Sequence, residues 1–125
     1  MTTQKVGTVK ISLFDKENYE MWKKKMLLFL RVENPKYIEI LKKGPKILMI
    51  IEEERVENNI VIQAARTYPK DPKNYTPDEK EHASLDSHLQ IILIDCLDSL
   101  MNSHVLNCRD AKHMWETIEI VNEGT

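Results

Sequence analysis

The chain has 125 residues, of which 42 % are hydrophobic and 30 % are charged, and its formal net charge is −2. This length suits one domain, the apolar content excludes wholesale disorder, and the charge excludes a strongly basic nucleic-acid binder. The apolar runs are far shorter than a membrane span, and residues 1–12 lack the apolar core of a secretory signal. Two cysteines make no disulfide framework, so we expect a cytoplasmic protein. Because the apolar runs are short, we expect no association with a membrane.

Charge is divided unevenly along the chain. Residues 1–43 contain ten Lys or Arg against five Asp or Glu, whereas residues 44–125 contain eight against fifteen. A basic first third and an acidic remainder can complement each other, within one chain or between copies. The alternative is a surface on which the charges are scattered and solvated.

The first predicted helix covers residues 18–33, with Asn18 as its N-cap. One face carries large apolar side chains at helical spacing, which is typical of a helix that faces a core: Tyr19, Trp22, Met26, Phe29 and Leu30. A second, narrower apolar stripe lies on another side: Met21, Leu28 and Val32. Asn34 caps a second helix over residues 35–43, which ends at Gly44.

Residues 45–75 are expected to be an irregular excursion between two helical parts. Apolar β-branched runs at 47–51 and 60–62 flank three glutamates and an Asn-Asn pair, which favours a short β-hairpin. Pro69 and Pro72 exclude a helix around them, because proline disfavours the α conformation at the preceding residue.

The second helical part begins at Thr76, which with Glu79 forms a capping box. We expect a long helix over residues 77–97, a short one over 99–104 and a last one over 111–122, capped by Asp110. The long helix carries Leu89 on its core face, whereas Ile91 and Ile94 lie on the other side.

These elements predict an all-α fold of about five helices in a single domain over residues 1–125. It comprises a helical pair at 11–43, the excursion at 44–75 and a second helical part at 76–125. We expect the core to be pinned by aromatic and leucine side chains from both helical parts: Tyr19, Trp22, Phe29, Leu89 and Trp115. The surplus apolar positions are candidates for a self-association surface: Met21, Leu28, Val32, Ile91 and Ile94. The alternative is that both helices are central and covered on two sides.

No reaction centre is apparent in the sequence. The three glycines are isolated, no nucleophile motif is present, and the carboxylates have the pattern of solvated charge, so we expect neither an enzyme nor a cofactor. Four potential zinc ligands (Cys96, His104, Cys108 and His113) lie near one another in sequence, but their helical positions do not converge, so no metal site is expected. The run of three lysines at 23–25 fans around its helix, which leaves only weak RNA contact.

Three blocks of the sequence resemble the N-terminal, capsid-type region of Gag polyproteins from plant Copia-type LTR retrotransposons. Residues 13–23 (LFDKENYEMWK) resemble the family's F-x-G-x-N-Y-x-x-W opening, with Lys16 where glycine is frequent. Residues 84–97 resemble its long central helix. Residues 105–115 (VLNCRDAKHMW) resemble its V-x-x-C-x-(T/S)-A-K-x-x-W block, with Asp110 at the Thr/Ser position. The resemblance rests on the order and spacing of the three blocks, and it covers residues 11–125.

The resemblance implies a helical unit that self-associates into a shell, so a homo-oligomer is the expected partner state. Gag proteins of this family continue into a second capsid lobe and an RNA-binding zinc knuckle, and this sequence contains neither. We therefore expect a fragment of a longer Gag, a decayed element or a remnant retained by a host. A groove that binds a protein or peptide and a weak RNA contact remain the alternative functions.

Overall fold

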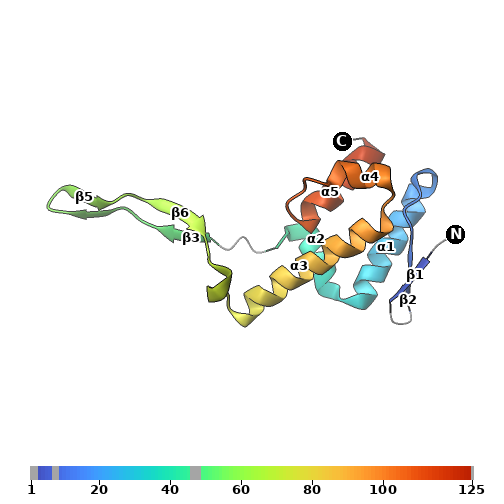
Figure 1. Cartoon of the computed structure of the whole chain (residues 1–125), viewed down its shortest axis with the longest axis horizontal. Helices are drawn as coiled ribbons and strands as arrows, with labels where there is room; N and C mark the ends of the chain where they lie inside the picture. The colour runs from blue at the N-terminus through green and yellow to red at the C-terminus, as the bar shows by residue number, and fades with distance from the viewer. Residues whose placement is uncertain (1–2, 7–8, 46–48, 125) are drawn as a thin grey trace. The chain divides into compact units, whose positions relative to one another are not determined.

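The computed structural model describes residues 3–6, 9–45 and 49–124, and of residues 3–6 and 9–12 the backbone alone (Figure 1). By its internal contacts the chain divides into two compact units. Unit 1 comprises Met1–Pro45 and His82–Thr125, and unit 2 comprises Lys46–Glu81. A single domain over residues 1–125 stays a prediction.

The described residues contain five α-helices, and their bounds agree with the predicted ones to within one residue. They are α1 (Tyr19–Glu33), α2 (Pro35–Lys43), α3 (Pro77–Cys96), α4 (Ser99–Val105) and α5 (Ala111–Glu123). The mostly helical architecture is therefore confirmed.

The helix ends follow the predicted capping chemistry with one exception. The Asn34 side chain accepts a hydrogen bond from the Lys36 amide at 3.0 Å, and Thr76 and Glu79 form the reciprocal capping box at 2.8 and 3.2 Å. Asn18 makes no side-chain capping bond, because a 3-10 turn, η1 (Lys16–Asn18), leads directly into α1. Its first turn is instead prepared by Asp15, which caps η1.

Three two-stranded antiparallel sheets accompany the helices in the described residues. β1 (Thr3–Val6) pairs with β2 (Val9–Ser12), β3 (Met49–Glu52) with β6 (Arg66–Pro69), and β4 (Arg55–Glu57) with β5 (Ile60–Gln63). The hairpin predicted within 45–75 is confirmed, but an all-α class is too narrow. The pair β1–β2 was not predicted, since strands of four residues are at the lower limit of a recognisable alternation.

Unit 2 is dominated by the β-ribbon of residues 49–69, in which β3 and β6 continue into β4 and β5 (Figure 1). Asn58 and Asn59 form the turn at its tip, with φ of 51° and 62°. A type I′ turn needs positive φ at both central residues, and asparagine tolerates this conformation better than most residues. The 3-10 turn η2 (Pro72–Asn74) then leads to the start of α3.

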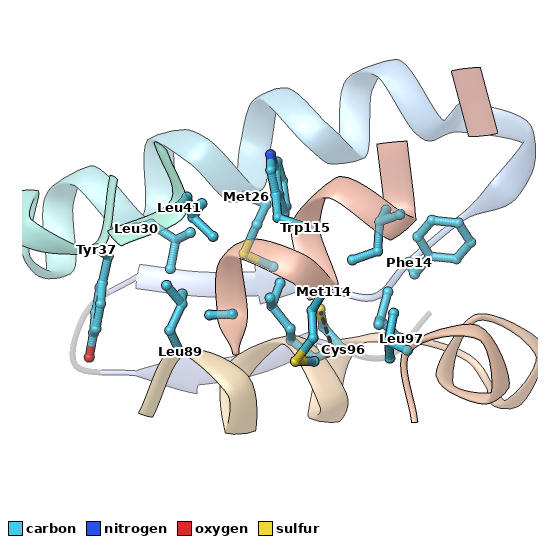
Figure 2. Close-up of a cluster of buried hydrophobic side chains, with 14 of the residues drawn as sticks. Phe14, Met26, Leu30, Tyr37, Leu41, Leu89, Cys96, Leu97, Met114 and Trp115 are labelled. Carbon is cyan, nitrogen blue, oxygen red and sulfur yellow. Dashed lines mark hydrogen bonds between the residues drawn. The ribbon is translucent and has the colours of Figure 1, made fainter. Parts of the chain in front are cut away.

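The hydrophobic core lies in unit 1 and gathers side chains from all five helices (Figure 2). Trp22 and Trp115 are both buried, and their ring centroids lie 5.8 Å apart at an interplanar angle of 31°. Tyr19, Phe29 and Leu89 are also buried, and Leu89 has no exposed surface. The first and last helices of unit 1 therefore meet through aromatic contact.

Phe14 extends this aromatic cluster and was not among the predicted core residues. Its ring meets the Trp22 ring edge-on at a centroid distance of 5.0 Å. Its backbone amide donates to the carbonyl oxygen of Cys96, the last residue of α3, at 2.7 Å. The segment before α1 is thus fixed to the end of α3 by one ring contact and one backbone hydrogen bond.

Truncating either tryptophan should destabilise unit 1 strongly. We expect Trp22→Ala and Trp115→Ala each to lower the free energy of unfolding by about 3–5 kcal/mol, because each removes a buried ring and leaves a cavity. The double variant should lose less than the sum, since the two rings contact each other. Leu106→Ala is the control, because that side chain is 78 % exposed. Urea denaturation measures these differences, and a loss below about 1 kcal/mol would show that the substituted tryptophan is peripheral.

Candidate functional site

A polar clamp joins α1 to the end of α5 beside the aromatic cluster. Lys23 Nζ donates to Glu123 Oε2 at 2.7 Å and forms an ion pair with Glu119 at 2.9 Å. The Tyr19 hydroxyl donates to the same carboxylate oxygen of Glu123. Lys23 is therefore occupied within the chain and is not part of a free basic surface.

The clamp changes the ionisation of its members. Burial and the hydrogen bond to Glu123 raise the pKa of the Tyr19 hydroxyl, so it stays protonated as a donor. Burial alone would lower the pKa of Lys23, but its hydrogen bonds to Glu123 and Glu119 outweigh this and raise it. Lys23 and Tyr19 hold the pKa of Glu123 below its usual 4.5. All three groups have the protonation that structural ion pairing needs, and no poised acid or base results.

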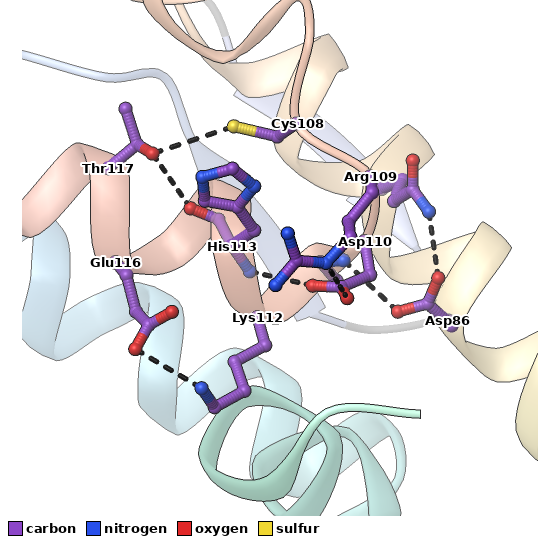
Figure 3. A network of polar contacts seen from close by, with 10 residues as sticks. Asp86, Cys108, Arg109, Asp110, Lys112, His113, Glu116 and Thr117 are labelled. Carbon is purple, nitrogen blue, oxygen red and sulfur yellow. Dashed lines mark hydrogen bonds and ion pairs between the residues drawn. The ribbon is translucent and has the colours of Figure 1, made fainter. Parts of the chain in front are cut away.

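A buried carboxylate on α3 holds the start of α5 (Figure 3). Asp86 is 7 % exposed, and its two oxygens accept from the Ala111 amide at 3.1 Å and from Gln90 Nε2 at 2.7 Å. Asp110 accepts from the His113 amide at 2.8 Å and caps the same helix. Sequence reasoning missed Asp86, although an acid next to Leu85 on the core face was a usable signal. It therefore satisfies a backbone amide at a helix N-terminus.

Three of the four residues weighed as zinc ligands, Cys96, Cys108 and His104, lie in ordinary structural settings, whereas the buried Nδ1 of His113 has no hydrogen-bond partner among the described residues. Cys96 is buried, its thiol donates to the Leu93 carbonyl at 3.3 Å, and burial raises its pKa to about 12. The Cys108 thiol lies 3.5 Å from the Thr117 hydroxyl, and His104 is exposed. Nowhere in the described part of the chain do three His, Cys, Asp or Glu side chains gather as a metal site would require.

The five surplus apolar side chains are exposed on two helices of unit 1. On α1 the exposed fractions are 47 % for Met21, 46 % for Leu28 and 67 % for Val32, and on α3 they are 55 % for Ile91 and 47 % for Ile94. Among the described residues, neither helix is therefore covered on both sides by the rest of unit 1. Exposed apolar side chains at helical spacing form a stripe that water solvates poorly. The apolar centre of a protein–protein interface has the same property in the unbound protein.

Exposed basic residues flank the apolar stripe on α1. At about 100° per residue, Met21, Leu28 and Val32 fall within an arc of about 40°. The side chains beside this arc carry positive charge and are exposed, and we call the six residues together the α1 outer face: Met21, Lys24, Lys25, Leu28, Arg31 and Val32. Its three cations form no ion pair with any other residue in the described ranges.

A second apolar feature of unit 1 is a groove of about 310 Å³ where α3, α4 and the start of α5 meet. Its lining includes Ile94, Leu106 and Met114 together with the half-buried Cys108. Asn102 also lines it; its amide nitrogen donates to the Ile94 and Leu97 carbonyls, at 3.1 and 3.2 Å. The groove places Ile94 beside an apolar hollow, an arrangement that suits a partner's side chain.

A polar cluster in the ribbon of unit 2 is centred on Glu52 at the end of β3. Glu52 accepts from Arg66 Nε at 2.8 Å, from the Tyr68 hydroxyl at 2.6 Å and from Gln63. These hydrogen bonds, led by those from Arg66 and Tyr68, lower the pKa of Glu52 to about 2. The cluster links β3, β5 and β6, so it stabilises the ribbon and leaves no reactive group unpaired.

Comparison with known proteins finds no match, whether to a family model, to a curated protein or to a solved structure. A hydrocarbon core takes about 20 consecutive apolar residues to cross, and no helix in the described ranges has that length and apolarity together.

The α1–α5 clamp should make stability depend on acid pH. The pKa of Glu123 is lowered in the folded chain, so its contribution is complete above 4.5 and is lost as the pH falls toward the lower folded value. We expect Glu123→Gln to reduce the free energy of unfolding at pH 7 and to converge with the wild type as the pH falls through the lowered folded pKa of Glu123. Chemical denaturation across this range measures the effect. The control is Glu20→Gln, which makes the same change at an exposed position of α1 outside the clamp. Parallel curves for wild type and Glu123→Gln would show that the clamp does not couple to folding.

Proposed function

We propose that this chain is a non-enzymatic, Gag-like structural module that self-associates into a capsid-type shell. The single observation that supports the proposal best is the exposure of both predicted apolar stripes, on α1 and on α3. A shell needs a stable body with adhesive surfaces and needs no reaction centre. The order of the three Gag-like sequence blocks supports the same function.

The position of the two stripes favours assembly beyond a pair. They belong to different helices, so one copy presents exposed apolar side chains on two elements. When unlike surfaces of successive copies meet, the contact is heterologous, and it generates rings or extended assemblies instead of a closed dimer. A shell is one such assembly.

The second candidate is a retained Gag-type domain that binds a peptide or helix of another protein. The apolar groove beside Ile94 favours it, since a groove of about 310 Å³ can take one or two large apolar side chains. A weak RNA contact is the third candidate, and it would require binding that falls steeply with salt. RNA contact is the least supported of the three candidates, because Lys23, the first of the three consecutive lysines, is already paired in the clamp.

Sedimentation velocity over a concentration series tests the proposal. We expect the mass of the wild-type chain to grow between about 10 and about 500 μM, the range in which weak assembly contacts operate. Leu28→Glu/Val32→Glu and Ile91→Glu/Ile94→Glu should each reduce that growth, because charge on an apolar contact opposes its burial. Each substitution lies at an exposed position, so folding should be retained.

The matched control is Leu100→Glu, which places a glutamate at an exposed leucine in the first turn of α4. It should associate like the wild type. A wild-type chain that stays monomeric throughout the series contradicts assembly and leaves the groove as the better-supported site. Equal loss of association in the control would show that added charge, not a specific surface, controls the result.

A further inference from the structure

The ribbon of residues 49–69 exposes an unusual amount of apolar surface. Six of its large hydrophobic side chains are at least 40 % exposed: Met49, Ile51, Val56, Ile60, Val61 and Ile62. None of the described residues of unit 2, 49–81, is buried. The ribbon therefore consists of paired strands without a core of their own.

A two-stranded ribbon of this kind is marginal when it stands alone in water. Such hairpins gain stability when a further strand or a helix covers their apolar face. Ile60, Val61 and Ile62 are consecutive, so their side chains alternate between the two faces of β5. A strand that paired with the edge of the ribbon would therefore not shield all three from water. The apolar side chains of the ribbon are typical of a surface that a binding partner covers.

The ribbon is also acidic. It carries four glutamates and two arginines and no lysine. Arg66 is paired with Glu52, whereas Glu53, Glu54 and Glu57 are exposed and form no ion pair with any residue of the described ranges. The last three lie between β3 and the tip, next to the exposed apolar side chains of β4 and β5.

The α1 outer face has the complementary composition. Its apolar stripe is flanked by Lys24, Lys25 and Arg31, all exposed. The stripe from Met21 to Val32 is about 17 Å long at 1.5 Å per residue. Strand β5 (Ile60–Gln63) spans about 10 Å over its three residue steps at roughly 3.3 Å per residue, so it can cover part of the stripe. Among the described residues, the unpaired charges of the ribbon are three carboxylates and one arginine, Arg55, so its net charge is opposite to that of the α1 outer face, whose apolar stripe is bordered by three free cations.

We propose that the ribbon is an assembly arm that docks on the α1 outer face of a second copy of this chain. The apolar side chains of β4 and β5 cover Met21, Leu28 and Val32, and the free glutamates meet the free cations. This inference rests on the self-association proposed above and assigns its contact. Because the arm and the face are different surfaces, each copy gives one arm and receives another, and the contact propagates.

Charge reversal on each side tests the contact. The arm variant is Glu53→Lys/Glu54→Lys/Glu57→Lys, and the face variant is Lys24→Glu/Lys25→Glu/Arg31→Glu. Each should weaken self-association by about 100-fold or more, because like charges then meet across the contact. A 1:1 mixture of the two variants should regain most of the wild-type association, since each arm again meets a face of opposite charge. Sedimentation velocity measures both results.

The control for net charge is Lys73→Glu/Lys80→Glu/Arg109→Glu, which changes the formal charge as much as the face variant does, at exposed positions elsewhere. It should associate like the wild type. If the wild type associates and neither reversal weakens it, the docking inference is wrong while self-association stands. If the wild type never associates, both fail.

Photocrosslinking identifies the occupant directly. A benzoylphenylalanine in place of Ile60, in an equal mixture of ¹⁴N and ¹⁵N chains, should crosslink to the peptide of residues 21–32 with mixed isotope labels. Crosslinks confined to one isotope would show that the arm docks on its own chain and would overturn the proposal. Crosslinks from ribbon to ribbon, or to the groove beside Ile94, would overturn it as well. A membrane partner would also overturn it. In that case the wild type would bind phosphatidylserine vesicles, the face variant would not, and the 1:1 mixture would regain no self-association.

Discussion

The body of this protein depends on the contact between the first and last helices of unit 1. Trp22 and Trp115 meet in the core, and the Lys23–Glu123 pair closes the same junction at the surface. Without this contact α5 would lose its aromatic partner and would keep its packing against α2 and α4 and the hydrogen bond from its Ala111 amide to Asp86. Residues about a hundred positions apart in sequence thus define one helical body, and the remaining core side chains fill the space between them.

The sequence was most informative where the physics is local. Helical spacing of apolar residues and capping side chains such as Thr76 and Asp110 act within one or two turns, so the helices could be located to within a residue. The positive-φ turn at Asn58 and Asn59 is also local, and it accounts for the hairpin. The short strands β1 and β2 escaped prediction because four residues carry too little pattern.

The candidate site was less accessible, because its parts depend on which distant segments meet. The exposed positions on α1 and α3 could be proposed from an excess of apolar residues, but their exposure is a property of the folded chain. The partners of Lys23 and the Ala111 amide that donates to Asp86 lie in α5, and no spacing rule links them to these positions. The free cations of the α1 outer face emerge only after Lys23 is seen to be paired.

The two units share the chain in an uneven way. Unit 2 is inserted between two stretches of unit 1, yet the buried side chains all come from unit 1 in the described residues. Substitutions or changes of length in the ribbon therefore have little leverage on the folding of the helical body. Sequence changes can accordingly accumulate in the ribbon at low thermodynamic cost to the helical body.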